Sequence, residues 1–184
     1  MATMPSSPAT PADRRTYVGV VGPGAGASAQ QVDVARDLGR ALAEVGFIVV
    51  TGGLDGVMAG AATGCHEVGG LSIGLLPGSD REAADPHHTV TLPTGLGELR
   101  NGLLVRASDA LVAVGSSWGT LSEVALACRT GVPVVLLGWE PQLLTGIDGP
   151  GRPPVRVDSV DEAVAGVVEV VQPGRRDVEG SSRS

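Results

Sequence analysis

The feature that most constrains this chain is a regular alternation between short aliphatic runs and longer segments of helical periodicity. The runs are continuous in Val, Ile and Leu, which is typical of strands buried on both faces of a parallel sheet. Right-handed crossovers between such strands place helices on both faces. We therefore predict an α/β fold, a Rossmann-like doubly wound parallel sheet in a three-layer sandwich. The predicted strands are 17–22, 47–53, 71–78, 109–115 and 132–139, with a short extended piece at 88–93, and the predicted helices are 30–45, 57–68, 98–107, 120–129 and 159–171.

The chain's 184 residues fit one compact domain. Residues 1–16 are rich in Pro, Ser, Thr and Ala, and residues 173–184 are polar, so we expect a disordered N-terminal arm and a disordered tail. The folded part is then 17–172, a Rossmann-like domain expected to bind a nucleotide or phosphate. Within it, the Pro/Gly-rich segment 140–157 is predicted to be a loop.

Composition excludes several classes of function. All 13 basic residues are arginine, which rules out a Walker-type phosphate loop, a lysine base and a Schiff-base lysine for pyridoxal phosphate. The net charge of −7 argues against a general binder of nucleic acid or anionic membranes. Cys65 and Cys128 form no CxxC pair and the histidines lack zinc-ligand spacing, so we expect no metal site. With neither an apolar run of about 18 residues nor a signal-peptide region, we expect a cytoplasmic protein.

Ligands of open parallel sheets bind beyond the carboxyl ends of the strands, so the loops after the strands are the places to examine. The first of these loops contains Gly22 and Gly24. Its spacing is not GxGxxG, and no acidic residue follows the second strand, so the dinucleotide fingerprint is incomplete. The glycines either make a tight turn or allow the backbone to approach a ligand closely.

The loop after the second predicted strand holds three glycines before a predicted helix. Free amides at the start of that helix would attract an anion. Gly60 and Gly64 are expected to let the helix pack closely on the sheet. Asp55 would repel a phosphate beside it, so we expect it to face solvent or a sugar hydroxyl. The residues predicted to surround the ligand here are Gly52, Gly53, Gly56, Val57 and Met58.

The most informative stretch follows the strand at 109–115 and reads Gly-Ser-Ser-Trp-Gly-Thr-Leu-Ser-Glu. Amides at a helix start, together with small hydroxyl side chains, would form a phosphate cradle that needs no lysine. Trp118 is expected to wall the pocket or to pack at a subunit contact, with stacking on a base as an alternative. The residues of the predicted cradle are Gly115, Ser116, Ser117, Gly119 and Thr120.

Two side chains near this loop have competing interpretations. Glu123 can act as a carboxylate on a bound sugar, but Thr120 and Glu123 also match the T-x-x-E capping box, in which both bond backbone N–H groups. Arg100, beside Asn101, can direct its donors at a phosphate or ribose, or can belong to a solvated helix face. From the residues alone, the structural interpretation is favoured for both Glu123 and Arg100.

Together, TGGLDGVMAGA, Arg-Asn and GSSWGTLSE resemble the LOG superfamily, often labelled lysine decarboxylase-like, and in particular its branch of molybdenum-cofactor-carrier-like proteins. The resemblance covers nearly all of 17–172. It implies a Rossmann-like fold and a homo-oligomer, either a dimer or a tetramer. The decarboxylase label does not fit, because the chain has no lysine to hold pyridoxal phosphate.

LOG enzymes are phosphoribohydrolases that release a base from a nucleoside 5′-monophosphate, and their hallmark is PGGxGTxxE with an upstream Arg-Lys. The resemblance places the motif's Glu on Glu123, its Arg on Arg100, and its Gly-Thr on Gly119 and Thr120. It therefore makes the functional roles of Arg100 and Glu123 the favoured ones. The chain departs from the enzyme pattern where Gly-Ser-Ser replaces Pro-Gly-Gly and where Asn101 replaces the lysine.

Two functions follow from the residues and the resemblance. The first is binding of a phosphorylated small molecule, either a nucleotide or the molybdenum cofactor that the carrier branch implies. The alternative is hydrolysis of the N-glycosidic bond of nucleoside 5′-monophosphates such as cytokinin ribotides, with Glu123 and Arg100 catalytic and no cofactor required. The departures affect the enzyme motif more than the phosphate cradle, so binding is favoured. Neither function involves nucleic acid or a membrane.

Overall fold

A computed structural model describes residues 15–140, 144 and 150–171. Its sheet has seven strands in the order β4-β3-β2-β1-β5-β6-β7, and every neighbouring pair is parallel. The chain therefore builds the sheet outward in one direction from β1, then returns to the other side of β1 with β5. The strands are β1 (Tyr17–Val21), β2 (Ile48–Thr51), β3 (Ser72–Leu76), β4 (Val90–Pro93), β5 (Ala110–Val114), β6 (Val134–Leu137) and β7 (Val155–Val157).

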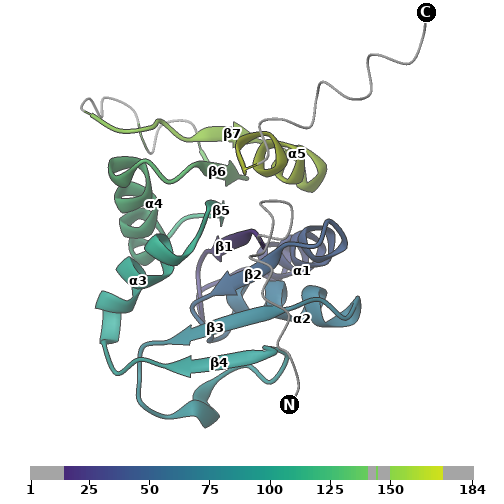
Figure 1. Cartoon of the computed structure of the whole chain (residues 1–184), viewed down its shortest axis with the longest axis vertical. Coiled ribbons are helices and arrows are strands. Elements are labelled where there is room, and N and C mark those ends of the chain that lie inside the picture. Colours follow the sequence, from purple (N-terminus) through teal and green to yellow (C-terminus); the bar gives the residue numbers. More distant parts are fainter. Residues whose placement is uncertain (1–14, 141–143, 145–149, 172–184) are drawn as a thin grey trace, which may run out of the picture.

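Helices cover both faces of this sheet. Figure 1 shows α1, α2 and α5 on one side and α3 and α4 on the other. The predicted three-layer, Rossmann-like α/β fold is thus confirmed. The α-helices are α1 (Ala29–Glu44), α2 (Val57–Glu67), α3 (Arg100–Ala107), α4 (Trp118–Thr130) and α5 (Val160–Val171), and the short 3-10 helices are η2 (Arg81–Ala83) and η3 (Gly97–Leu99).

Each face of the sheet has its own aliphatic core. On one face, Val20 of β1 packs in a cluster with Leu38 of α1 and Val167 of α5. On the other, Leu111 of β5 clusters with residues of α3 and α4, among them Val124. These side chains are fully or almost fully buried. Burial on both faces explains why the strand sequences are continuous aliphatic runs instead of alternating apolar and polar residues.

The glycines of α2 pack against α1, which differs from the packing on the sheet predicted for them. A Cβ atom at Gly60 would lie 2.6 Å from the carbonyl oxygen of Val32, and one at Gly64 would overlap the carbonyl of Arg36. Both acceptors belong to α1, so the small residues bring two helix backbones together. The two glycines correctly indicated that α2 packs closely against another element, but the sequence does not show that this element is α1.

Several boundaries differ from the predicted ones, and three of the differences concern the sheet edge or the helices at the site. The segment 140–157, predicted to be a loop, ends in β7, where Val155 pairs with Val135 of β6. This edge strand is only three residues long and is partly polar, so it lacks the aliphatic run that marks the other strands. Helix α4 begins at Trp118 rather than at residue 120, and the predicted helix 98–107 begins with η3.

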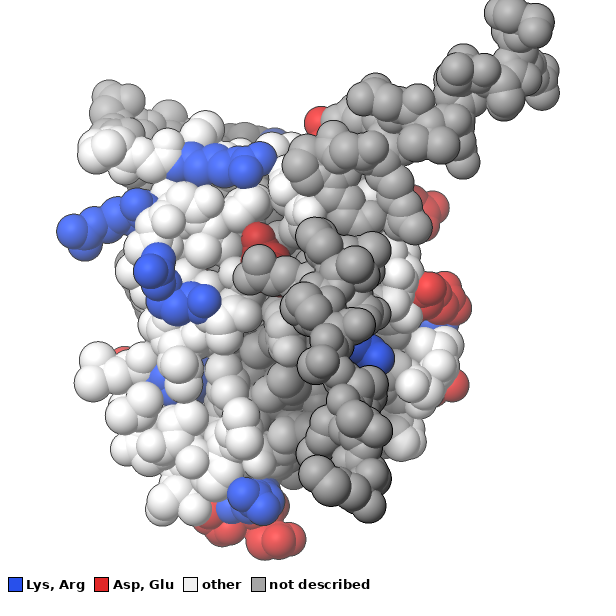
Figure 2. Space-filling model, in the orientation of Figure 1, with Lys and Arg blue, Asp and Glu red and all other residues white. Residues whose placement is uncertain are grey.

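The predicted disordered segments 1–16 and 173–184 lie outside the described residues, except for Arg15 and Thr16. The carbonyl oxygen of Thr16 accepts the Ile48 N–H at 2.9 Å. None of the helices in the described part of the chain has the length and apolarity needed to cross a bilayer. On the face in Figure 2, arginine and carboxylate side chains form small separate groups rather than one continuous basic surface.

Candidate functional site

The three glycine-rich loops meet at the carboxyl ends of β1, β2 and β5, where the strand order reverses. A Cβ atom at Gly22 would lie 2.6 Å from both the carbonyl oxygen of Val114 and the side chain of Val57. One at Gly56 would lie 2.5 Å from the carbonyl oxygen of Pro23. Because these approaches leave no room for side chains, glycine is required where the loops touch. The crevice at a strand-order reversal is where open α/β sheets bind ligands.

A cavity of about 160 Å³ lies between these loops and the start of α3. Most of the residues predicted for the site border it, which brings together segments that are far apart in the sequence. Its lining is Val21, Gly22, Gly24, Gly52, Met58, Arg100, Asn101, Ser117, Gly119, Thr120 and Glu123.

Ser117 is the N-cap of α4, and its hydroxyl oxygen accepts the Thr120 N–H at 3.1 Å. The Thr120 hydroxyl lies 2.8 Å from the Ser117 hydroxyl, so the two share one hydrogen bond. Glu123 then lies beyond the third helical position that a capping box requires. The interpretation of Thr120 and Glu123 as a capping box is therefore wrong, and Glu123 is available to the cavity.

Glu123 and Arg100 form a buried ion pair in the cavity wall. The Glu123 Oε1 atom lies 3.7 Å from the Arg100 Nη1 atom, too far for a hydrogen bond. Only 6% of Glu123 and 8% of Arg100 are exposed. Burial raises the pKa of Glu123 to about 7, although the Arg100 charge acts to lower it. Burial also lowers the pKa of Arg100, against the opposing effect of Glu123.

The Arg100 guanidinium is not fully satisfied by its surroundings. Its Nε atom is buried and has no hydrogen-bond partner among the described residues. The group lies flat against Gly52, where a Cβ atom would be 2.6 Å from the Arg100 Cζ atom. A buried donor without an acceptor is costly, since its lost hydration is not replaced. The interpretation that Arg100 belongs to a solvated helix face is thus wrong, and its guanidinium instead has an N–H donor available to a ligand.

Some of the amides predicted to be free are used by the protein itself. Val57 N–H donates to the Pro23 carbonyl at 3.0 Å, and Gly53 N–H donates to the Thr51 hydroxyl at 3.0 Å. In the first turn of α4, the amides of Trp118 and Gly119 have no acceptor among the described residues. The α4 terminus therefore has two amides available to an anion, whereas the Val57 amide at the start of α2 is already used.

A closed ring of hydrogen bonds holds the second glycine loop in place. The Thr51 hydroxyl, which accepts Gly53 N–H, lies 2.6 Å from His88 Nε2. On the other side of the buried imidazole, Nδ1 lies 3.1 Å from the Asp85 carbonyl oxygen, and Asp85 N–H donates to the Gly53 carbonyl. Since Nδ1 must donate to that carbonyl, Nε2 of the neutral ring accepts the Thr51 proton. Burial lowers the pKa of His88, which favours this neutral form.

The remaining predicted residues do not line the cavity, and Ser116 among them is exposed. Gly115 has a φ of 67° and lies against the Gln31 side chain, whose Oε1 accepts Ser28 N–H in the capping box of α1. The sequence did not predict that Thr51, His88 and Gln31 hold these loops. Only Gln31 had a signal, because Ser28 and Gln31 have capping-box spacing. The predicted residues outside the lining are Gly53, Gly56, Val57, Gly115 and Ser116.

Comparison with known proteins identifies the family. The family model described as the SLOG cluster4 family matches residues 15–164. The molybdenum cofactor binding protein of the phototrophic bacterium Rippkaea orientalis superposes with a TM-score of 0.81 at 32% identity, covering 86% of this chain and 98% of that one. The molybdenum cofactor carrier protein of Chlamydomonas reinhardtii gives 0.78 at 38% identity, covering 86% and 99%.

A protein of Archaeoglobus fulgidus is 35% identical over 120 residues, which is 65% of this chain and 78% of that protein. The resemblance to the LOG superfamily and its carrier-like branch, predicted from the three sequence segments, is confirmed by the family match and by these structural neighbours.

Proposed function

Because the chain belongs to the SLOG cluster4 family, we propose that it binds a phosphorylated small molecule in the cavity, and that this ligand is a pterin of the molybdenum cofactor type. The observation that carries the proposal is the buried Arg100 guanidinium, whose Nε lacks a partner among the described residues. A phosphate oxygen would supply the missing acceptor. The names of the similar Rippkaea and Chlamydomonas proteins support the choice of cofactor.

The residues present fit a phosphate group. Arg100 would hold two of its oxygens with the forked donors that suit phosphate better than a single ammonium does. The free amides of Trp118 and Gly119 would hold the others, at the positive end of the α4 dipole. Because Ser117 and Thr120 share one hydrogen bond, one of their hydroxyl protons is left for the ligand.

The protonation state of Glu123 would control how well the site binds a phosphate. An ionised carboxylate next to Arg100 competes with a phosphate for the same cation, whereas a neutral one does not. A Glu123 pKa of about 7 means that the group can take up a proton near neutral pH at little cost. We therefore expect the phosphate to bind the form in which Glu123 is protonated.

Calorimetry with ribose 5-phosphate, AMP and molybdenum cofactor released from a molybdoenzyme tests the proposal. Arg100→Gln removes the charge, and we expect it to weaken binding of all three by about 30-fold or more. Arg106→Gln is the matched control, because Arg106 lies on the same helix but is exposed and has no ion pair among the described residues. Equal affinities of wild type and Arg100→Gln would refute the site assignment.

A phosphoribohydrolase is the second candidate, and one observation favours it. Glu123 is a buried carboxylate with a pKa of about 7 inside the cavity, the condition in which a general acid or base operates near neutral pH. The measurement is release of free base and ribose 5-phosphate from nucleoside monophosphates. Release that is lost in Glu123→Gln, with nucleotide still bound, would establish the enzyme.

The homo-oligomeric state and the cytoplasmic location predicted from the sequence are also part of the proposal. Their support is the resemblance to the carrier-like branch. Light scattering on the purified full chain and fractionation of cells that express it test the two points separately.

A further inference from the structure

Two large apolar residues that adjoin the cavity lining in sequence have exposed side chains. Trp118 is 88% exposed and Leu99 is 80% exposed, more than any other large hydrophobic residue in the described part of the chain. Each is joined directly to the cavity lining, since Trp118 lies between Ser117 and Gly119, and Leu99 precedes Arg100. Both residues are therefore attached to segments that line the cavity.

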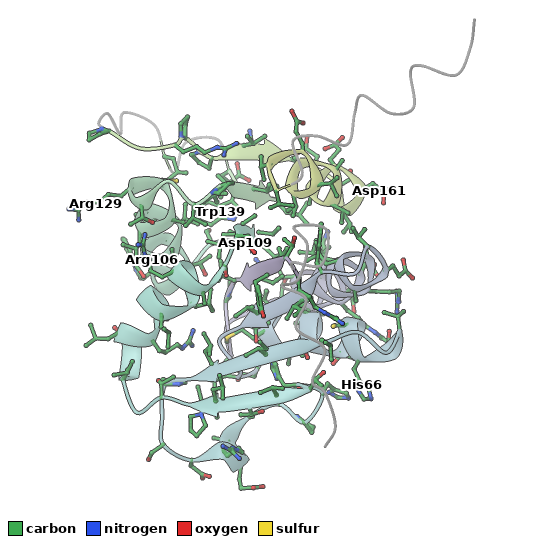
Figure 3. The ribbon with its side chains drawn as sticks, in the orientation of Figure 1. His66, Arg106, Asp109, Arg129, Trp139 and Asp161 are labelled. Carbon is green, nitrogen blue, oxygen red and sulfur yellow. The ribbon has the colours of Figure 1, made fainter. Side chains whose placement is uncertain are left out.

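The chain's other tryptophan shows what a purely structural role looks like. Trp139 is 3% exposed and lies in the core cluster between the sheet and α4, where Figure 3 labels it. Its Nε1–H donates to the Ala113 carbonyl at 3.1 Å. Trp118 has no hydrogen bond from its indole and no ring partner among the described residues. A tryptophan can bury 150–250 Å² of surface, and nearly all of this remains available at Trp118.

The cavity is open to solvent and smaller than pockets that enclose a whole drug-sized ligand. Its volume of about 160 Å³ corresponds to roughly five water molecules, which suits a phosphate group and little more. Pockets that enclose drug-sized ligands are roughly 300–1,000 Å³. A nucleotide or pterin whose phosphate occupies the cavity would extend its ring beyond it.

We propose that Trp118 is a stacking platform for the planar heteroaromatic ring of the ligand whose phosphate occupies the cavity. This inference rests on the proposed function, and it adds the residue that would hold the flat ring, such as a purine or a pterin, that is joined to the phosphate. Stacking on an aromatic side chain is tolerant of ring identity, because every such ring has a π face.

The experiment compares AMP, which has a ring, with ribose 5-phosphate, which has none. We expect the wild type to bind AMP roughly tenfold more tightly than ribose 5-phosphate, as one stacked base typically provides. Trp118→Ala should remove that difference, because it deletes the ring but keeps the backbone amide proposed to hold the phosphate, and Trp118→Phe should restore part of it. Free adenine is measured in the same samples so that hydrolysis of AMP is not taken for weak binding.

Fluorescence gives a second readout, because Trp118 and Trp139 are the chain's two tryptophans. AMP should quench the emission of the exposed indole, ribose 5-phosphate should not, and the quenching should disappear in Trp118→Phe.

The outcomes separate this inference from the proposed function. Equal wild-type affinities for the two phosphates would overturn stacking and leave the phosphate site standing, and binding of neither would overturn both. A Trp118→Ala variant that weakens both ligands equally and changes the oligomeric state in light scattering would assign Trp118 to a contact between copies of the chain, and the stacking role would be wrong.

Discussion

The protonation state of Glu123 gives a quantitative prediction, because the expected change in phosphate affinity with pH follows from the pKa of this carboxyl. Burial raises the pKa of Glu123 to about 7, so about half of the molecules have a neutral carboxyl at pH 7. At pH 9 that fraction is roughly 1%. If only the protonated form accepts a phosphate beside Arg100, the affinity falls by about 50-fold between pH 7 and pH 9.

The sign of this dependence follows from linkage. If the phosphate favours the neutral carboxyl, binding takes up a proton, and a ligand whose binding takes up a proton binds more weakly as the pH rises. Below about pH 6 a phosphate monoester gains its own second proton and loses charge, which weakens binding from the acidic side. We therefore expect the affinity for ribose 5-phosphate to be greatest between about pH 6 and pH 7.

Calorimetric titrations with ribose 5-phosphate from pH 5.5 to pH 9 measure this profile. In Glu123→Gln the decline above pH 7 should disappear, while the decline below pH 6, which belongs to the ligand, should remain. Glu98→Gln is the matched control, because Glu98 is exposed in η3 and lies outside the cavity lining. A wild-type affinity that is constant from pH 7 to pH 9, or a Gln variant with the wild-type decline, would refute the role given to Glu123.

Three further substitutions test the loops around the cavity. Gly52→Ala should displace the Arg100 guanidinium, 2.6 Å from the new methyl at its Cζ, and abolish phosphate binding in calorimetry, whereas Gly26→Ala, with nothing within 4 Å, should bind normally. Ser117→Ala should cost about 1 kcal/mol in urea unfolding through loss of the α4 cap, and no loss would contradict the capping role. Because burial lowers the pKa of His88, wild-type stability should decrease as pH falls below about 6.5. The free energy of unfolding of His88→Gln should decrease less over that range. An equal decrease between pH 7.5 and pH 5 in the two proteins, measured by urea unfolding, would rule this out.

The sheet and the convergence of the loops could be predicted from the sequence, because both follow from the properties of individual strands. Continuous aliphatic runs indicate burial on both faces, and parallel strands bring their carboxyl ends to one edge. The register of α4 was not predictable in the same way. Ser117 and Thr120 have the spacing of a cap and its partner, and so do Thr120 and Glu123. The structure places the cap at Ser117, where the extended backbone directly precedes the helix.

His88 shows a different limit of sequence analysis. Its ring is buried because it covers Gly74, where a Cβ atom would lie 3.0 Å from the His88 Cδ2 atom. That contact joins a loop to a neighbouring strand, and no local pattern encodes it. The same holds for Arg100, since only the folded chain shows that Gly52 creates the space in which its guanidinium lies.

The geometry of the Arg100–Glu123 pair favours a preorganised ligand site over a pair that stabilises the fold. A buried arginine ordinarily gains stability when a carboxylate bonds it in a close, forked geometry. Here Glu123 stays 3.7 Å away, and burial opposes the charge on both partners. The pair is therefore poorly suited to stabilise the fold. A bound phosphate would remove both costs, because it would accept the Arg100 hydrogen bonds while Glu123 becomes neutral. A stabilising ion pair would predict that Glu123→Gln unfolds more easily at pH 8; a prepared binding site predicts little loss, or a gain, because the variant no longer has to bury an ionised carboxylate.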